Sequence, residues 1–171
     1  MFKDRKFEGM EPKFSEKVDL SEVYFTRLQP GEDLFAGIAE FCKKNNMERA
    51  VILSAIRSLC DVGFRDLKTG IDLPVNVDKT NLMEEYGPFE LLTLEGSVVP
   101  LVGQFGALND GDLVLHLHCT LGTSYGNLFG GHFFKATVFT TTELFLAKVK
   151  NSQVKKKQST VTGLTEMRTD I

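Results

Sequence analysis

Apolar residues recur at helical spacing in only one stretch of the chain. Leu34, Ile38, Phe41, Cys42 and Asn45 lie on one face of a helix, and four of these five residues are apolar. The stretch opens at Glu32-Asp33, which places negative charge in the first turn, where the helix dipole favours it. Asn45-Asn46 can supply a left-handed cap at the other end. The pattern therefore predicts one principal helix that ends at about Asn45.

Short apolar runs separated by Gly, Asn and Asp fill most of the remaining chain. Such runs, bounded by turn residues, are typical of strands. One helix followed by many strands with tight turns indicates an α+β fold, a compact single domain with a mainly antiparallel sheet. The expected strands are residues 23–28, 50–56, 61–65, 89–94, 113–120, 133–142 and 144–149.

The two ends of the chain are more polar than its centre. We expect an N-terminal arm over residues 1–21, one domain over residues 22–150, and a polar C-terminal tail over residues 151–171. A length of 171 residues suits one domain with a single core. The tail contains Lys155-Lys156-Lys157, the only basic run in the sequence, and such runs are usually solvated.

Composition and charge narrow the classes of function. The net charge of −3 argues against a broad nucleic-acid surface, so we expect this chain alone to bind DNA weakly and without sequence preference. No apolar run approaches the roughly 20 residues of a membrane span, and the charged N-terminus does not resemble a signal peptide. Three cysteines without C-x-x-C spacing favour reduced thiols in a cytoplasmic protein.

The expected strand over residues 113–120 contains two of the candidate metal ligands. Strand alternation places Leu117 and Cys119 on an apolar face, and His116 and His118 together on the other face. Side chains two positions apart on a strand project in parallel, roughly 7 Å apart at their roots, so two imidazoles can lean toward one ion. Gly130-Gly131-His132 follows a short turn, so a returning strand can bring a third imidazole beside the pair. Three neutral imidazoles around an open position are typical of zinc sites, and the sequence predicts a divalent metal, zinc, on His116, His118 and His132.

At these residues the chain resembles the PPC domain, a module conserved in plants and prokaryotes. The resemblance covers roughly residues 22–150. Its motifs are a central strand, an His-x-His pair and a Gly-Gly-His turn, preceded by an Arg and a helix start. In this chain, in sequence order, the corresponding residues are Arg27, Gly31-Glu-Asp-Leu34, Gly87-Pro-Phe-Glu-Leu-Leu-Thr-Leu-Glu-Gly96, His116-Leu-His118, Gly130-Gly-His132 and Thr142-Glu143.

The resemblance implies a compact subunit that assembles as a homotrimer. In prokaryotic members it implies a metal on the histidines that match His116, His118 and His132. Plant members carry AT-hooks, which bind the minor groove of A·T-rich DNA, and this sequence has no AT-hook. Two positions depart from the family: Arg57 stands where Gly is usual, and Pro88 stands where plant members often have Arg. The second departure argues against transferring plant partner interactions to this chain.

Several functions are compatible with such a site. The first is a stand-alone trimeric metal-binding module whose biochemical role the sequence does not specify. The alternatives are a DNA-binding or DNA-associated regulator, and a metal-dependent enzyme or small-anion binder at the trimer interface. An enzyme would need a general base beside the metal. Glu90 and Glu143 are candidates for this base, although carboxylates on a sheet face are more often simply solvated. Arg57 would suit an anion if it lines the site. The sequence assigns no catalytic residue and no organic cofactor.

Overall fold

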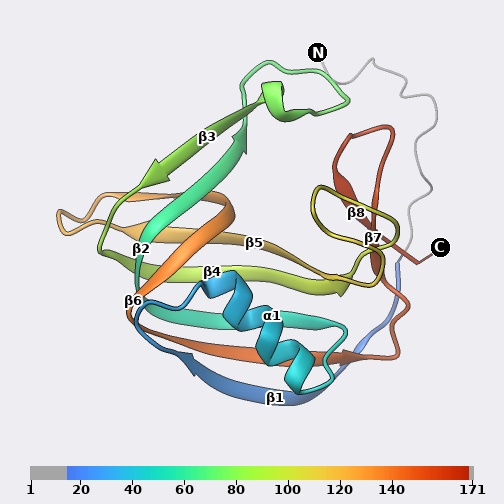
Figure 1. Ribbon diagram of the computed structural model, residues 1–171, viewed down its shortest axis with the longest axis horizontal. Coiled ribbons are helices and arrows are strands. Elements are labelled where there is room, and N and C mark those ends of the chain that lie inside the picture. The colour runs from blue at the N-terminus through green and yellow to red at the C-terminus, as the bar shows by residue number, and fades with distance from the viewer. Residues whose placement is uncertain (1–14, 170–171) are drawn as a thin grey trace.

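The computed structural model describes residues 15–169 and shows one helix packed against a mainly antiparallel six-stranded sheet (Figure 1). The predicted fold class is confirmed. Residues 1–14 of the expected N-terminal arm lie outside the described range. The elements are β1 (Asp19–Leu28), α1 (Leu34–Lys44), β2 (Ala50–Leu67), the short 3-10 helix η1 (Val77–Lys79), β3 (Thr80–Glu85), β4 (Phe89–Pro100), β5 (Leu113–Gly122), β6 (Leu128–Lys150), β7 (Lys155–Gln158) and β8 (Thr165–Arg168).

The helix forms where its apolar spacing predicts it. Asp33 caps the N-terminus, because its Oδ1 accepts a hydrogen bond of 2.8 Å from the backbone N–H of Ala36. Asn46 adopts a left-handed conformation, with φ of 52°, just beyond the C-terminus. The buried face carries Leu34 and Ile38, both fully inaccessible, and burial of each stabilises the fold by about 1.5–3 kcal/mol.

The sheet closes on itself because two strands are unusually long. Its order is β1-β6-β5-β4-β2-β3, and β6 also pairs with β2, so that β6, β5, β4 and β2 form a ring. β2 joins the two predicted strands 50–56 and 61–65 into one, and β6 joins 133–142 to 144–149. β3 and the end of β2 project from the ring as an arm (Figure 1).

The sequence pattern did not indicate β3, β7 or β8. β7 and β8 form a small two-stranded hairpin within the region that we expected to be a polar tail. The hairpin lies against the domain, since the backbone N–H of Val102 donates to the carbonyl oxygen of Lys156 over 2.7 Å. Within residues 15–169, no helix is both long enough and apolar enough to cross a membrane.

Arg57 occupies a strained position on β2. Its φ is 115°, in the region that favours glycine, which explains why the resembling family usually has Gly there. Strain of this kind destabilises a fold by about 1–3 kcal/mol. The guanidinium pairs with the Glu143 carboxylate over 3.0 Å, but the Arg57 side chain is half exposed, and such pairs contribute less than about 1 kcal/mol.

We therefore expect Arg57→Gly to be more stable than Arg57→Ala by about 1 kcal/mol. Both variants remove the ion pair, and only glycine relieves the strain. At an ordinary strand position the order is reversed, because Gly is less stable than Ala by about 0.5–1 kcal/mol. Urea denaturation of the two variants measures the difference, and an Ala variant at least as stable as the Gly variant would contradict the strain.

Candidate metal centre

The three histidines meet where β5 pairs with β6. His118 on β5 lies directly opposite His132 on β6, and His116 lies two residues before His118 on the same face of β5. Leu117, between the two β5 histidines, is fully buried on the opposite face, as the alternation predicts. The sheet therefore holds the core on one side of β5 and three imidazoles on the other.

The ring nitrogens converge on one point. Nε2 of His116 lies 3.2 Å from Nε2 of His118, and Nδ1 of His132 lies 3.4 Å from the same His118 atom. Each of the three side chains offers a nitrogen within 4.8 Å of those of the other two. In a tetrahedral site with bonds of about 2.0–2.1 Å, neighbouring ligand nitrogens stand about 3.3 Å apart. Two of the three nitrogen separations therefore match the ligand spacing of one tetrahedral ion.

The paired glycines make this convergence sterically possible. A Cβ on Gly130 would overlap the carbonyl oxygen of Cys119 on β5. A Cβ on Gly131, whose φ is 155°, would overlap the carboxylate of Asp66. The close backbone approach that Gly130-Gly131 was expected to allow is therefore present, and it brings His132 beside His118.

Asp66 on β2 anchors the backbone of His132. β6 leaves β5 after Phe133 and pairs with β2, so the main-chain ladder between β5 and β6 ends beside the site. At this fork the backbone N–H of His132 donates to Oδ1 of Asp66 over 2.8 Å. No local sequence pattern indicates Asp66, because its contact with His132 depends on the crossing of two strands.

Lys156 on β7 reaches the site from the C-terminal hairpin. Its Nζ lies 2.7 Å from Nδ1 of His116, and the residue is only 2% exposed. The expectation of a solvated basic run is therefore wrong for Lys156, although Lys157 is exposed. Burial lowers the pKa of the Lys156 ammonium to about 8.

His116 and His132 are held in their neutral form, which is the form that binds metals. Burial, reinforced by the positive charge of Lys156 and by the other two histidines, lowers the pKa of His116 to about 4. Burial also lowers the pKa of His132, with further contributions from His118 and Lys156, while the Asp66 carboxylate acts in the opposite direction. Lone pairs on these rings are thus available at neutral pH.

These shifts predict that the metal-free protein loses stability in mild acid. The pKa of His116 is lower in the folded chain than in the unfolded one, so between about pH 6.5 and pH 4 the unfolded chain binds more protons. The contribution of this group is complete above about pH 6.5 and declines as the pH falls toward the folded pKa.

Thermal unfolding of EDTA-treated protein between pH 7.5 and pH 4.5 measures this effect. The wild type should lose more thermal stability than a His116→Gln, His132→Gln double variant over the same range, because glutamine does not titrate. Equal losses in the two proteins would show that other groups control the acid sensitivity.

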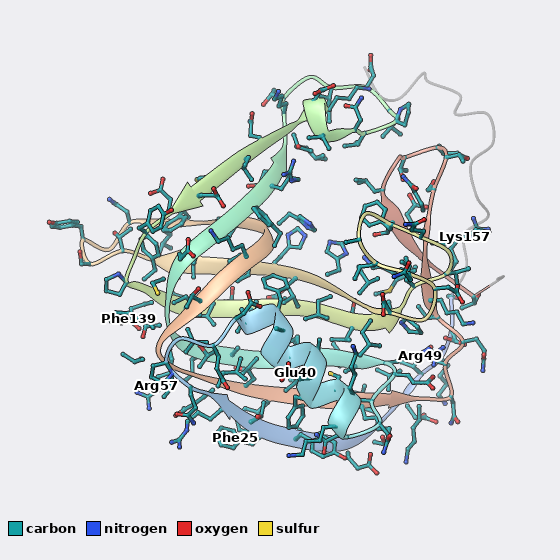
Figure 2. All side chains as sticks on the ribbon, viewed as in Figure 1. Phe25, Glu40, Arg49, Arg57, Phe139 and Lys157 are labelled. Atoms are coloured by element: carbon teal, nitrogen blue, oxygen red, sulfur yellow. The ribbon has the colours of Figure 1, made fainter. Side chains whose placement is uncertain are left out.

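The structure places the other candidate residues away from this centre. Glu143 pairs with Arg57, and Glu90 lies opposite Gly122, four residues beyond His118 along β5. Figure 2 shows Arg57 at the opposite end of the molecule from Lys157 and the hairpin. Arg57 therefore does not line the site, and the condition under which it would suit an anion there is not met.

Glu95 is a second carboxylate that lies directly across the sheet from one of the histidines. It is the cross-strand partner of His118 on β4, and antiparallel partners share a face of the sheet. Its side chain is exposed. The sequence motif contained Glu95, but the pairing of β4 with β5 was needed to place it beside His118.

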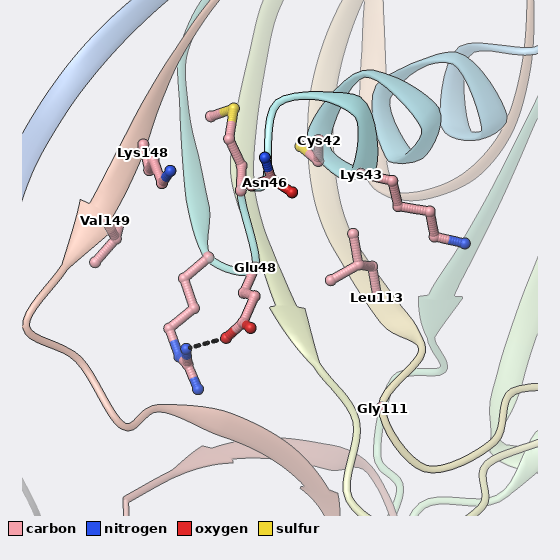
Figure 3. A pocket seen from close by; sticks show the side chains of 10 residues that line it. Cys42, Lys43, Asn46, Glu48, Gly111, Leu113, Lys148 and Val149 are labelled. Atoms are coloured by element: carbon pink, nitrogen blue, oxygen red, sulfur yellow. Dashed lines mark hydrogen bonds and ion pairs between the residues drawn. The ribbon is translucent and has the colours of Figure 1, made fainter.

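A separate depression lies at the C-terminal end of α1 (Figure 3). It is lined by Lys43, Arg49 and Lys148, and the Arg49 guanidinium pairs with Glu48 over 3.0 Å. None of the three histidines lines this depression. The metal-ligating chemistry of the described residues is thus confined to the fork between β5 and β6.

Most of the chain matches the model of one protein family. The model of the Plants and Prokaryotes Conserved (PCC) domain matches residues 16–150. This match ends before β7, so the hairpin that carries Lys156 lies outside it.

Solved structures share the fold. A plant- and prokaryote-conserved (PPC) protein from Pyrococcus horikoshii is 26% identical, with a TM-score of 0.72, over 91% of this chain and 99% of that one. A protein from Archaeoglobus fulgidus, described as metal-containing, is 24% identical, with a TM-score of 0.74 and the same coverage of both chains.

Curated relatives are much longer proteins. The bifunctional protein GlmU of Synechococcus sp. (strain JA-3-3Ab) is 28% identical over 146 residues, which are 85% of this chain and 20% of GlmU. The chain thus spans about a fifth of the length of that relative.

Proposed function

Since the chain belongs to the Plants and Prokaryotes Conserved domain family, we propose that it is a homotrimeric cytoplasmic protein that binds one divalent metal ion per subunit, zinc, through His116, His118 and His132. The spacing of the ring nitrogens carries the proposal. Separations of 3.2 and 3.4 Å bracket the value of about 3.3 Å for tetrahedral ligands. The metal-containing description of the Archaeoglobus fulgidus protein supports it further.

The surroundings of the histidines fit a metal ion. His132 is anchored through its backbone by Asp66, and the low pKa of His116 leaves its ring unprotonated at neutral pH. All-nitrogen sets of three imidazoles suit zinc, which favours four-coordinate sites. An ion held there would act as a Lewis acid toward whatever occupies its fourth position. The residues described here bind and orient that ion, and we assign no reaction to them.

Metal analysis of protein purified without a polyhistidine tag tests the metal proposal. We expect close to one zinc per chain, removal of the zinc by a chelator, and restoration by added zinc ions. Absence of metal in the purified protein, together with no binding of added zinc at micromolar concentration, would refute it.

Two exposed apolar patches support the homotrimer. The β1–β6 patch comprises Val23, Phe25, Ile56 and Phe145, which lie on the sheet face directed away from α1. Phe25 and Phe145 are cross-strand partners whose rings are 5.3 Å apart, and each is about half exposed. Contiguous exposed apolar groups of this kind mark interaction surfaces.

The second patch lies on the projecting arm. This arm patch comprises Leu67, Leu82 and Tyr86, all more than half exposed. A cyclic trimer needs two different surfaces on each subunit, because each interface joins one surface to the other on the next subunit. The two patches would supply such a pair.

A further inference from the structure

Two of the three proposed ligands are each supported by a segment from outside the β5–β6 pair. The arm, formed by β3 and the end of β2, supports His132, because the Asp66 carboxylate accepts its backbone N–H over 2.8 Å. The C-terminal hairpin lies behind His116. There Nζ of Lys156 is 2.7 Å from Nδ1 of the ring, whereas Nε2 of the same ring faces His118. The two supports therefore reach the metal centre from segments that are far apart in the sequence.

These two segments also contact each other at their tips (Figure 1). In the loop between β2 and β3, the backbone N–H of Val75 donates to the carbonyl oxygen of Thr162, in the turn between β7 and β8, over 2.6 Å. A Cβ on the next residue, Gly163, would stand 2.2 Å from the Val75 carbonyl oxygen. Val75 is only 6% exposed. We call this contact between residue 75 and residues 162–163 the clasp.

The clasp closes a ring of contacts beside the metal centre. The ring runs from His132 through Asp66 into the arm, across the clasp into the hairpin, and back to the His116 ring. Beyond Phe64, β2 pairs only with β3, and β7 pairs only with β8. Two-stranded ribbons are marginally stable when nothing else holds them. A contact that joins the two ribbons therefore restrains both supports of the centre.

On the basis of the proposed metal function, we infer that the clasp is a positioning device for the metal ion. It holds the arm against His132 and the hairpin against His116, so that the ligand nitrogens keep their spacing. Groups that orient metal ligands typically contribute 10–100-fold to metal affinity. The coupling is reciprocal, since a clasp that strengthens metal binding must itself be strengthened by bound metal to the same extent. The hairpin lies beyond residues 16–150, so the clasp is not part of the matched family domain.

Gly163→Ala tests this inference, because the added Cβ would push Val75 away from the turn. Gly70→Ala is the matched control. Its φ of 77° is close to the 78° of Gly163, so alanine introduces similar backbone strain, but its Cβ would meet nothing within 4 Å. Only the first variant should open the clasp. Competition with a chromophoric chelator should show zinc affinity at least about tenfold weaker in Gly163→Ala and close to that of the wild type in Gly70→Ala.

Amide hydrogen exchange of the wild type measures the reverse effect and needs no variant. Zinc should slow exchange of the Val75 N–H at least about tenfold, because bound metal favours the closed clasp. The Asn45 N–H is the control amide, since it bonds to the Phe41 carbonyl oxygen at the end of α1 and takes no part in the clasp. Its exchange should change little.

Circular dichroism shows whether Gly163→Ala keeps the fold, and the exchange measurement decides the question if it does not. A folded Gly163→Ala protein that binds zinc as tightly as Gly70→Ala would overturn the inference. So would exchange at Val75 that zinc leaves unchanged. In either case the metal function would stand. A wild type that takes up no zinc would refute the proposed function, and the inference with it.

Discussion

Replacing any one of His116, His118 and His132 by alanine should weaken zinc binding by at least about a hundredfold, with little loss of stability in the metal-free protein. Even groups that only support a ligand typically contribute 10–100-fold to metal affinity, so loss of a ligand should exceed that effect. The core is not affected, because the imidazoles lie on the face of the sheet opposite Leu117. Competition with a chromophoric chelator measures the affinities.

Thermal unfolding provides a second measurement of the same effect. A ligand that binds only the folded state at a thousandfold excess over its dissociation constant stabilises that state by about 4 kcal/mol. Zinc should therefore raise the melting temperature of the wild type and leave that of each alanine variant nearly unchanged. Thr120→Ala is the control, because Thr120 lies on the same strand two residues beyond His118. If the histidine variants bound zinc as tightly as this control, the assignment of the three histidines as metal ligands would be refuted.

Much of the fold could be predicted from the sequence because its signals are local. The helix has its apolar stripe, its Asp33 cap and its left-handed Asn46 within one continuous stretch of the chain, residues 33–46. Strand joins were harder to foresee. β2 continues through Asp61, where the φ of 48° and a shift in register mark an irregularity. The two strands expected on either side of this region are therefore one long strand.

The metal centre was only partly predictable for the same reason. His116 and His118 share a strand, and His132 follows after a short turn, so their proximity has a local explanation. Asp66 and Lys156 reach the site through the crossing of β2 and the docking of the C-terminal hairpin. Both events are tertiary, and a run of three lysines by itself gives no indication that the middle one is buried.

Phe145→Glu should convert the proposed trimer to monomers at micromolar concentration. Each buried Phe contributes about 2 kcal/mol of apolar burial, and a trimer contains three copies of the interface. A glutamate there would also place an unpaired charge in an apolar contact. The subunit should still fold, because Phe145 is 47% exposed on the face directed away from α1. Native mass spectrometry and sedimentation measure the state of assembly.

Leu164→Glu is the control for this variant. Leu164 is also an exposed apolar residue, but it lies between β7 and β8 and belongs to neither patch. We expect it to remain trimeric. A wild type that is monomeric at micromolar concentration, or a Phe145→Glu protein that stays trimeric, would contradict the assignment of the β1–β6 patch.

Mixing two monomeric variants tests which surfaces meet. Leu82→Glu should also dissociate the trimer, because it disrupts the arm patch. In a cyclic assembly the β1–β6 patch of one subunit contacts the arm patch of the next. The Leu82→Glu chain keeps an intact β1–β6 patch and the Phe145→Glu chain keeps an intact arm patch, so one functional interface remains between them. The mixture should therefore form heterodimers that neither variant forms alone. If each patch instead paired with its own copy, the separate variants would form homodimers through their intact patches, and mixing would produce nothing new.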